Sequence, residues 1–250
     1  MTIGNEGVNF GCNHCQWTGG QKYDSVGNRD RRIVQSVPTA RAEEVVPDRS
    51  ARPIALWKSA LDPRRTIAEK YLNGRGLSLG ADIALSLVRF LPSYPWRDDQ
   101  DRVVDHAVML VAFRSIIDDR LVAVHRTALM PDGTKIGRKM LGPVKGAAMK
   151  IAPDTDVELG LTICEGFETG LAGRAMGFRP CWALGSAGAI ATFPVLAGID
   201  VLTMLAEPDA ANASAVEQCG NRWADAGREV DVVMSTVGGD INDAYKATAS

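Results

Sequence analysis

The 250-residue sequence has no run of about 18 consecutive apolar residues, so no membrane-spanning helix is predicted. The first residues lack a basic stretch followed by an apolar one, so no secretory signal is predicted either. Cysteine is scarce, at five residues, and three of them (Cys164, Cys181 and Cys219) stand singly in apolar or helical context, as buried free thiols do. We therefore expect a reducing, cytoplasmic setting, with no disulfide framework and no membrane partner.

The sequence also has little overall charge, with a formal net charge of −2. The charged residues are, however, unevenly distributed along the chain. Residues 1–150 carry 23 Lys and Arg against 16 Asp and Glu, a net +7, whereas residues 151–250 carry 5 against 14, a net −9. The asymmetry indicates a part that handles polyanions joined to an acidic, metal-holding part, with uneven surface charge as the alternative.

The hydrophobic pattern predicts an α/β fold. In the last hundred residues, apolar strand-like runs at 159–164, 181–184, 201–206 and 230–234 alternate with helical patterns at 168–176 and 210–226. Such alternation predicts a parallel sheet with helices on both faces.

The upstream residues predict a smaller α+β subdomain. Helical periodicity covers 54–72, an apolar segment runs from 83 to 91 and ends at Pro92, and Val- and Ala-rich strands follow at 107–113 and 121–129. The predicted divisions are a short cysteine-bearing segment, a polar Arg-rich linker, the α+β subdomain and the α/β domain, at 1–20, 21–52, 53–155 and 156–250.

Acidic residues follow three of the predicted parallel strands. Glu165 comes directly after the first strand, Glu207 and Asp209 come after the third, and Asp240 and Asp243 lie beyond the last. Ligands of open α/β sheets bind beyond the carboxyl ends of the strands, so these groups are expected at one edge. Gathered carboxylates repel one another, and a cation such as Mg²⁺ relieves that repulsion. The alternative is that they are helix N-caps and first-turn charges.

These segments, Ile163-Cys164-Glu165-Gly166, Glu207-Pro208-Asp209 and Gly239-Asp240-Ile241-Asn242-Asp243, together resemble the Toprim domain, most closely that of bacterial, plasmid and phage DNA primases. The resemblance implies that Glu165 is the catalytic acid/base. It also implies that Mg²⁺ (or Mn²⁺) is held by Glu207, Asp209, Asp240 and Asp243, with Asn242 supporting the last loop. Glu207 stands where the family usually has Asp, and the longer side chain displaces its carboxylate.

The basic part carries a second resemblance. His125-Arg126-Thr127, Asp132-Gly133 and Gly142-Pro143-Val144-Lys145-Gly146 are similar to a stretch that precedes the Toprim domain in plasmid- and phage-borne primases. Basic groups in such a stretch can bind template or triphosphate phosphates, and a solvated β-surface is the alternative. His125 and Trp96 are expected to be packed residues rather than functional ones. The basic groups concerned are Arg126, Arg138, Lys139 and Lys145.

Cys12 and Cys15, separated by two residues, resemble one knuckle of the zinc ribbon that precedes primase cores. A structural Zn²⁺ takes four ligands, and His14 is the only further candidate nearby. A partial or degenerate zinc ribbon is expected, with a metal-free turn as the default.

The resemblance implies a DNA primase, a nucleotidyltransferase that makes short primers on single-stranded DNA from nucleoside triphosphates. No Walker A sequence occurs, so a replicative helicase would be a separate partner. Two rivals remain open, namely a Toprim metal-dependent nuclease and a catalytically decayed protein that binds nucleic acid or a partner.

Overall fold

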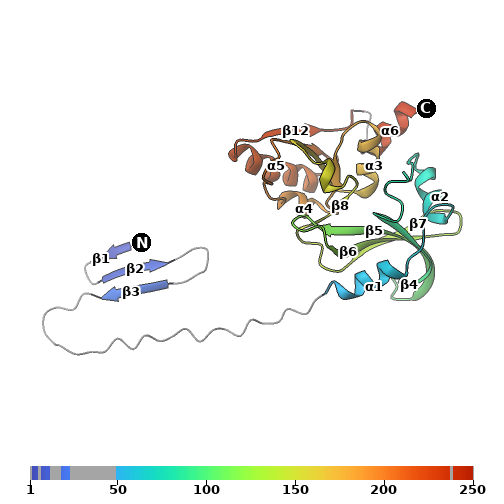
Figure 1. Ribbon diagram of the computed structural model, residues 1–250, viewed down its shortest axis with the longest axis horizontal. Coiled ribbons are helices and arrows are strands. Elements are labelled where there is room, and N and C mark those ends of the chain that lie inside the picture. Colours follow the sequence, from blue (N-terminus) through green and yellow to red (C-terminus); the bar gives the residue numbers. More distant parts are fainter. Residues whose placement is uncertain (1, 5–6, 12–17, 23–48, 237–238, 250) are drawn as a thin grey trace. The chain divides into compact units, whose positions relative to one another are not determined.

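The computed structural model describes residues 2–4, 7–11, 18–22, 49–236 and 239–249 (Figure 1). The chain divides into two compact units, Met1–Val46 and Pro47–Ser250. In the first unit, β1 (Thr2–Gly4), β2 (Gly7–Gly11) and β3 (Thr18–Lys22) form an antiparallel sheet. The predicted zinc residues Cys12 and Cys15 lie outside the described residues.

The second unit is built on one continuous sheet. Its strands run in the order β12-β11-β9-β10-β8-β5-β6-β7, and β4 pairs with β5 beside this path. β5 (Val103–Ser115), β6 (Leu121–Leu129) and β7 (Lys135–Leu141) are antiparallel neighbours. β8 (Ala147–Lys150) joins the two halves, because it pairs with β5 at one end and with β10 at the other, antiparallel in both cases.

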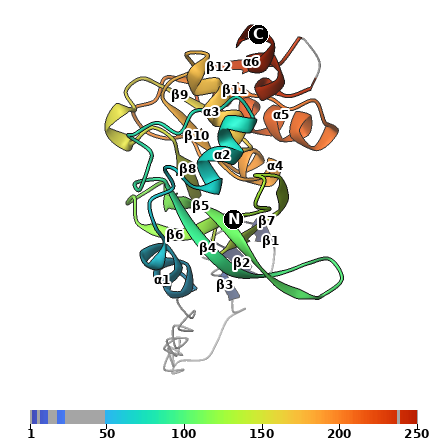
Figure 2. The same cartoon turned by 90° about the vertical axis from the view of Figure 1, so that its right-hand side faces the viewer.

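β4 (Val88–Arg97) corrects one expectation from the sequence, because this strand continues through Pro92 and Pro95. Proline cannot donate a hydrogen bond to a ladder, so it is tolerated only at sheet edges and bulges. The pairing of β4 with β5 shifts register between Leu91 and Tyr94, and β4 has no other strand partner in the described sheet. Figure 2 shows the long hairpin that β4 and β5 form.

Two short helices complete this half, α1 (Ala51–Ser59) and α2 (Ile67–Gly74). Thr66 starts α2 as an N-cap, because its Oγ1 accepts a hydrogen bond from the Ala68 N–H at 3.2 Å. The buried face of α2 carries Ala68, Tyr71 and Leu72, at the spacing of successive helical turns.

The C-terminal half follows the predicted alternation of strands and helices. β9 (Gly160–Cys164), β10 (Cys181–Ala183), β11 (Val201–Leu205) and β12 (Glu229–Val233) are parallel to their neighbours in this part of the sheet. The helices between and after them are α3 (Phe167–Ala175), α4 (Ala187–Ala191), α5 (Ala210–Asp225) and α6 (Ile241–Ala249), and a short 3-10 turn, η1 (Asp154–Asp156), precedes β9.

Alternating side chains of the parallel strands feed two cores, one on each face of the sheet. In β9, Leu161 and Ile163 join the core with α4 and α5, where Trp223 is fully buried. Cys164 points the other way and joins the core that contains Phe167 of α3 and Ile241 of α6. The predicted fold class is thus confirmed, namely an α/β domain with helices on both faces, preceded by a smaller α+β part.

None of the helices in the described part of the chain is both long and apolar enough to cross a membrane.

Candidate active site

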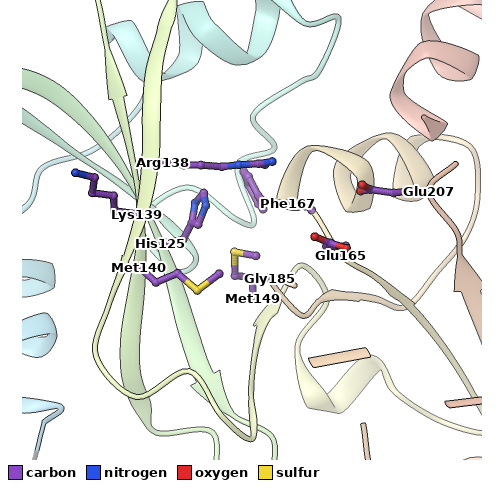
Figure 3. Close-up of a pocket in the computed structure, with 10 residues that line it drawn as sticks. His125, Arg138, Lys139, Met140, Met149, Glu165, Phe167, Gly185 and Glu207 are labelled. Carbon is purple, nitrogen blue, oxygen red and sulfur yellow. The ribbon is translucent and has the colours of Figure 1, made fainter. Parts of the chain in front are cut away.

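A cavity of about 280 Å³ lies beyond the carboxyl ends of β9 and β11, against β6 and β7. Its acidic wall consists of Glu165, which directly follows β9, and Glu207, which lies two residues after the end of β11. Facing them in Figure 3 are His125 and Arg138, from β6 and β7. Phe167, Met140 and Met149 supply apolar surface between the two sides. Carboxylates and cationic or neutral donors therefore share one small polar cavity.

The acidic loops are joined by Asn212, a fully buried residue of α5. Its Nδ2 donates to Glu165 Oε2 at 3.2 Å, and its Oδ1 accepts the backbone N–H of Glu207 at 2.9 Å. The Glu165 carbonyl oxygen also accepts the Gly185 N–H at 2.8 Å, which ties this loop to the end of β10. Asn212 thus fixes both carboxylate-bearing loops relative to each other, a role that the sequence alone did not indicate.

Glu207 lies in an unfavourable electrostatic environment for an anion. Partial burial raises the pKa of Glu207, and the charges of Glu165, Asp240 and Asp209 raise it further, while a 3.2 Å hydrogen bond from Thr169 Oγ1 opposes the shift. Glu165, Asp240 and Asp209 are therefore near enough to Glu207 to act on its pKa. Repulsion of this kind is relieved when a cation enters.

Asp209 and Asp240 also serve as helix caps. Asp209 Oδ1 accepts the Asn212 N–H at 2.9 Å at the start of α5, and Asp240 Oδ1 accepts the Asp243 N–H at 3.0 Å at the start of α6. The capping alternative thus holds for one oxygen of each carboxylate. Asp243 itself lies in the first turn of α6, half exposed, with Lys246 Nζ 3.8 Å from its carboxylate.

Carboxylates are suitable ligands for a hard cation, but those of this site do not form a compact cluster. Among the residues that the structure describes, no group of three or more His, Cys, Asp or Glu side chains lies close enough to hold a metal ion. Mg²⁺ commonly uses one or two carboxylates and completes its coordination with water and substrate phosphates. The repelled carboxylate of Glu207, open to a polar cavity, fits that type of site.

The four predicted phosphate-binding residues occupy three different places. β6 and β7 pair with Thr127 opposite Arg138 and Arg126 opposite Lys139, so neighbouring residues along each strand point to opposite faces. Figure 3 shows Arg138 extending toward the side of Phe167 and Glu207, while Lys139 points the other way. Arg138 and Lys139 both line the cavity, and of the two only Arg138 extends toward the carboxylates.

Arg126 and Lys139 meet aromatic rings on the opposite face. Lys139 Nζ donates to the Arg97 carbonyl at 2.6 Å and lies 5.2 Å from the centre of the Trp96 ring. The Arg126 guanidinium lies 5.6 Å from the Tyr94 ring centre and 5.9 Å from that of Trp96, and it donates to Tyr94 Oη at 3.2 Å. These two cations pack on aromatic rings there.

Lys145 lies elsewhere, on the exposed loop between β7 and β8. It lines a second, mostly apolar cavity of about 340 Å³, together with Val144, Ser186 and Phe193. The structure does not bring Lys145 to the cavity that holds Glu165, so its predicted contact with phosphate stays a prediction.

Tyr71 and Glu168 form a buried hydrogen-bonded pair between α2 and α3. Tyr71 Oη of α2 donates to Glu168 Oε1 of α3 at 2.6 Å, and both side chains are buried. Burial alone would raise the pKa of Glu168, but the Tyr71 hydrogen bond, its own backbone N–H and the positive surroundings hold it below its ordinary value. Burial and the adjacent Glu168 charge raise the pKa of Tyr71. Glu168 is therefore an ionised, buried group that anchors α2 to α3.

Comparisons with known proteins agree with this architecture. A family model described as "Toprim domain" matches residues 160–250, and a domain of unknown function (DUF7146) matches residues 47–151. No curated protein matches the sequence significantly.

Solved structures of primase cores have a similar fold. A DNA primase domain from Pseudomonas aeruginosa is 15% identical, with 79% of this chain and 74% of that chain covered and a TM-score of 0.53. The E. coli primase catalytic core is 14% identical, with 77% and 74% covered and a TM-score of 0.54. The DnaG primase catalytic domain bound to ssDNA is 13% identical, with 78% and 75% covered and a TM-score of 0.55. At these identities the similarity concerns the fold.

Proposed function

Because residues 160–250 match the Toprim domain family and the fold is similar to that of primase cores, we propose that the protein is a nucleotidyltransferase that makes short primers on single-stranded DNA. The observation that carries this proposal is the single cavity in which Glu165 and Glu207 lie opposite Arg138. Such a cavity offers an acidic side for a hydroxyl nucleophile and a basic side for phosphates.

In the proposed reaction, a 3′-hydroxyl attacks the α-phosphate of a nucleoside triphosphate and pyrophosphate leaves. Positioning and charge stabilisation supply most of the catalysis in such reactions. Glu165 accepts a hydrogen bond from the hydroxyl and assists its deprotonation, while Asn212 keeps the Glu165 carboxylate in a fixed orientation. Arg138 binds the phosphate chain as a permanently charged donor.

Glu207 is the residue best placed to hold Mg²⁺ or Mn²⁺, with Asp209 and Asp240 near enough to act on its pKa. A bound cation would supply charge neutralisation for the reacting phosphate. Glu207 carries one methylene more than Asp, so we expect it to tolerate Mn²⁺ better than Mg²⁺, because Mg²⁺ demands near-ideal octahedral geometry.

The proposed partners are a single-stranded DNA template and nucleoside triphosphates. A replicative helicase encoded separately and a cytoplasmic location complete the proposal. A zinc role for Cys12 and Cys15 stays a prediction.

The test is a primer-synthesis assay on single-stranded DNA with Mg²⁺ or Mn²⁺, comparing the wild type with Asp209→Asn. Asparagine caps helices as well as aspartate does, so this variant keeps the start of α5 and removes only the charge. Glu217→Gln, an exposed change on the same helix, is the matched control. We expect product from the wild type and the control, and at least a hundredfold less from Asp209→Asn.

The same assay separates the rivals. Degradation of the template without triphosphates indicates the nuclease. Template binding with no metal-dependent product, unchanged in Glu165→Gln, indicates the decayed binding protein. Either result refutes the primase proposal.

A further inference from the structure

His125 lines the active-site cavity and has a buried nitrogen without a partner. The residue is 6% exposed, and its Nδ1 makes no hydrogen bond to any part of the chain that the structure describes. A buried polar atom without a partner destabilises a fold, so native structures keep few of them. One established reason to keep such an atom is that a ligand pairs with it.

The neighbouring Thr127 offers a comparison, because it is also buried with an unpartnered polar atom but does not border the cavity. Thr127 follows two residues later on the same face of β6, is fully buried, and its Oγ1 likewise lacks a partner in the described structure. His125 borders the cavity, whereas Thr127 does not. The two residues therefore form a natural pair for comparison.

The charges around His125 favour an anionic ligand. The pKa of His125 is lowered to about 4, mainly by burial and also by the charges of Arg138, Lys135 and Arg126, while the charge of Glu168 opposes them. Without a ligand the imidazole is thus neutral at pH 7, and three positive groups act on it against the charge of Glu168. Tyr71, the other titratable group packed there, is engaged with Glu168.

The carboxylates and Arg138 together indicate at which end of the cavity a phosphate would bind. Glu165 and Glu207 repel phosphate oxygens at their end of the cavity, whereas Arg138 attracts them at the other. His125 and Arg138 line the same cavity (Figure 3), and the Arg138 charge is near enough to lower the pKa of His125. A phosphate bound to Arg138 would therefore lie within reach of the imidazole.

We propose that His125 is a phosphate-binding residue of this site, which with Arg138 holds the phosphate chain of the incoming nucleoside triphosphate. The proposal rests on the proposed function for the identity of the ligand, but it makes a separate claim about binding. The imidazole donates a hydrogen bond to a phosphate oxygen, and the phosphate in turn favours the protonated ring, so that binding adds a charged contact.

The test measures binding of inorganic tripolyphosphate by titration calorimetry, with the full chain and with Mg²⁺ present. His125→Leu removes both nitrogens while filling similar space, and His125→Asn restores a donor near the position of Nδ1. We expect the leucine variant to raise the Kd at least tenfold and the asparagine variant to recover most of that loss. Thr127→Val should change the Kd by less than twofold.

Thermal unfolding of the same ligand-free variants distinguishes binding from packing. If His125 serves the ligand, His125→Leu should melt at the same temperature as the wild type or higher, because it removes an unpaired polar atom. Equal affinity in His125→Leu and wild type overturns the proposal. So does a lower melting temperature combined with equally weak binding in the asparagine variant.

A second measurement needs no variant. The sequence has only three histidines, His14, His106 and His125, so imidazole signals can be followed by nuclear magnetic resonance on histidine-labelled wild type. Tripolyphosphate should shift the His125 ring signals and leave those of His106 unchanged. Unshifted His125 signals at saturation, or no binding by the wild type, overturn the proposal.

The outcomes for function and for binding can be told apart. A wild type that binds tripolyphosphate through His125 but makes no primer refutes the proposed function alone. A wild type that makes primers, with tripolyphosphate binding unchanged in His125→Leu, refutes this inference alone.

Discussion

Replacing Asn212 should reduce both stability and activity, because this residue connects the two carboxylate-bearing loops. Asn212→Ala removes the hydrogen bond to the ionised Glu165 carboxylate and leaves the backbone N–H of Glu207 without its partner. Hydrogen bonds to charged groups contribute about 1.5–3 kcal/mol, and neutral ones about 1 kcal/mol. The free energy of unfolding should therefore fall by about 3 kcal/mol. In a folded unit of this size that corresponds to a decrease in Tm of roughly 6–12 °C.

Asn212→Asp tests the electrostatic part of the same argument. The introduced carboxylate can still accept the Glu207 N–H, but it places a second negative oxygen against Glu165. Like charges this close raise the pKa of both groups. The folded state then binds more protons than the unfolded one, so stability should be near normal at acidic pH and fall as pH rises through the raised pKa values. Mn²⁺ should restore part of the lost stability by binding between the carboxylates.

The assays are thermal unfolding between pH 4.5 and 8, with and without Mn²⁺, and primer synthesis at pH 7.5. Asn221→Ala is the control, an exposed asparagine on the same helix. The reasoning is refuted if Asn212→Ala melts within 2 °C of the control, or if the stability of Asn212→Asp does not depend on pH any more than that of the wild type.

Three further predictions follow from the same structure. Tyr71→Phe leaves the buried Glu168 carboxylate without its 2.6 Å donor and should cost about 1.5–3 kcal/mol at pH 7. Because the pKa of Glu168 is held below its usual 4.5, the stability that this pair contributes is present above that pH and is lost as pH falls through the folded-state pKa. Urea unfolding should thus show the gap between variant and wild type narrowing in acid, and a gap that widens there contradicts the assignment. Arg138→Gln should weaken tripolyphosphate binding at least tenfold, whereas Lys139→Gln, whose ammonium lies over Trp96, should change it by less than twofold in the same titration; equal losses would show that both reach the ligand. Gly239→Ala should lower primer synthesis more than Gly177→Ala does, because both glycines have positive φ but only at Gly239 would the added Cβ overlap the Asp243 carboxylate; similar activities in the two variants would remove Asp243 from the site.

The C-terminal half of the fold follows closely from its sequence. Each predicted strand and helix between residues 159 and 234 has a counterpart, because the apolar runs are short and clearly bounded and feed cores on both faces of the sheet. The acidic groups could be assigned to one edge for the same reason. In a parallel sheet, the ends of neighbouring strands meet whatever the details of packing.

Long-range pairing decided what the sequence could not predict. β4 crosses Pro92 and Pro95 because its only strand partner in the described sheet is β5, a fact that no local pattern reveals. β7 was not predicted as a strand, so the alternation that sends Arg138 and Lys139 to opposite faces was not available either. Four basic residues close in sequence were therefore treated as one cluster.

The two residues that matter most to our proposals were missed for another reason. In the sequence, Asn212 is an ordinary polar residue of an amphipathic helix. Its importance comes from its hydrogen bonds to Glu165 and Glu207, which lie in two separate loops earlier in the chain. His125 fits a packed strand position, as predicted, and it is indeed buried. Our proposal that its unpartnered nitrogen serves a ligand depends on the cavity beside it, which the sequence does not reveal.

The continuous sheet explains how a chain with little net charge presents two opposed charges at one site. β8 pairs with β5 and with β10, so the basic antiparallel half and the acidic parallel half belong to one hydrogen-bonded surface. Arg138 on β7 and Glu165 at the end of β9 are thereby placed by strands of one sheet rather than by a flexible connection between the halves. A phosphate chain with its cation carries both signs of charge, and a rigid cavity with one sign on each wall would orient such a ligand in a single direction. The sequence carries a net +7 in residues 1–150 and a net −9 in residues 151–250. This distribution agrees with the structure, in which the first half supplies the basic wall of the cavity and the second half supplies the acidic wall.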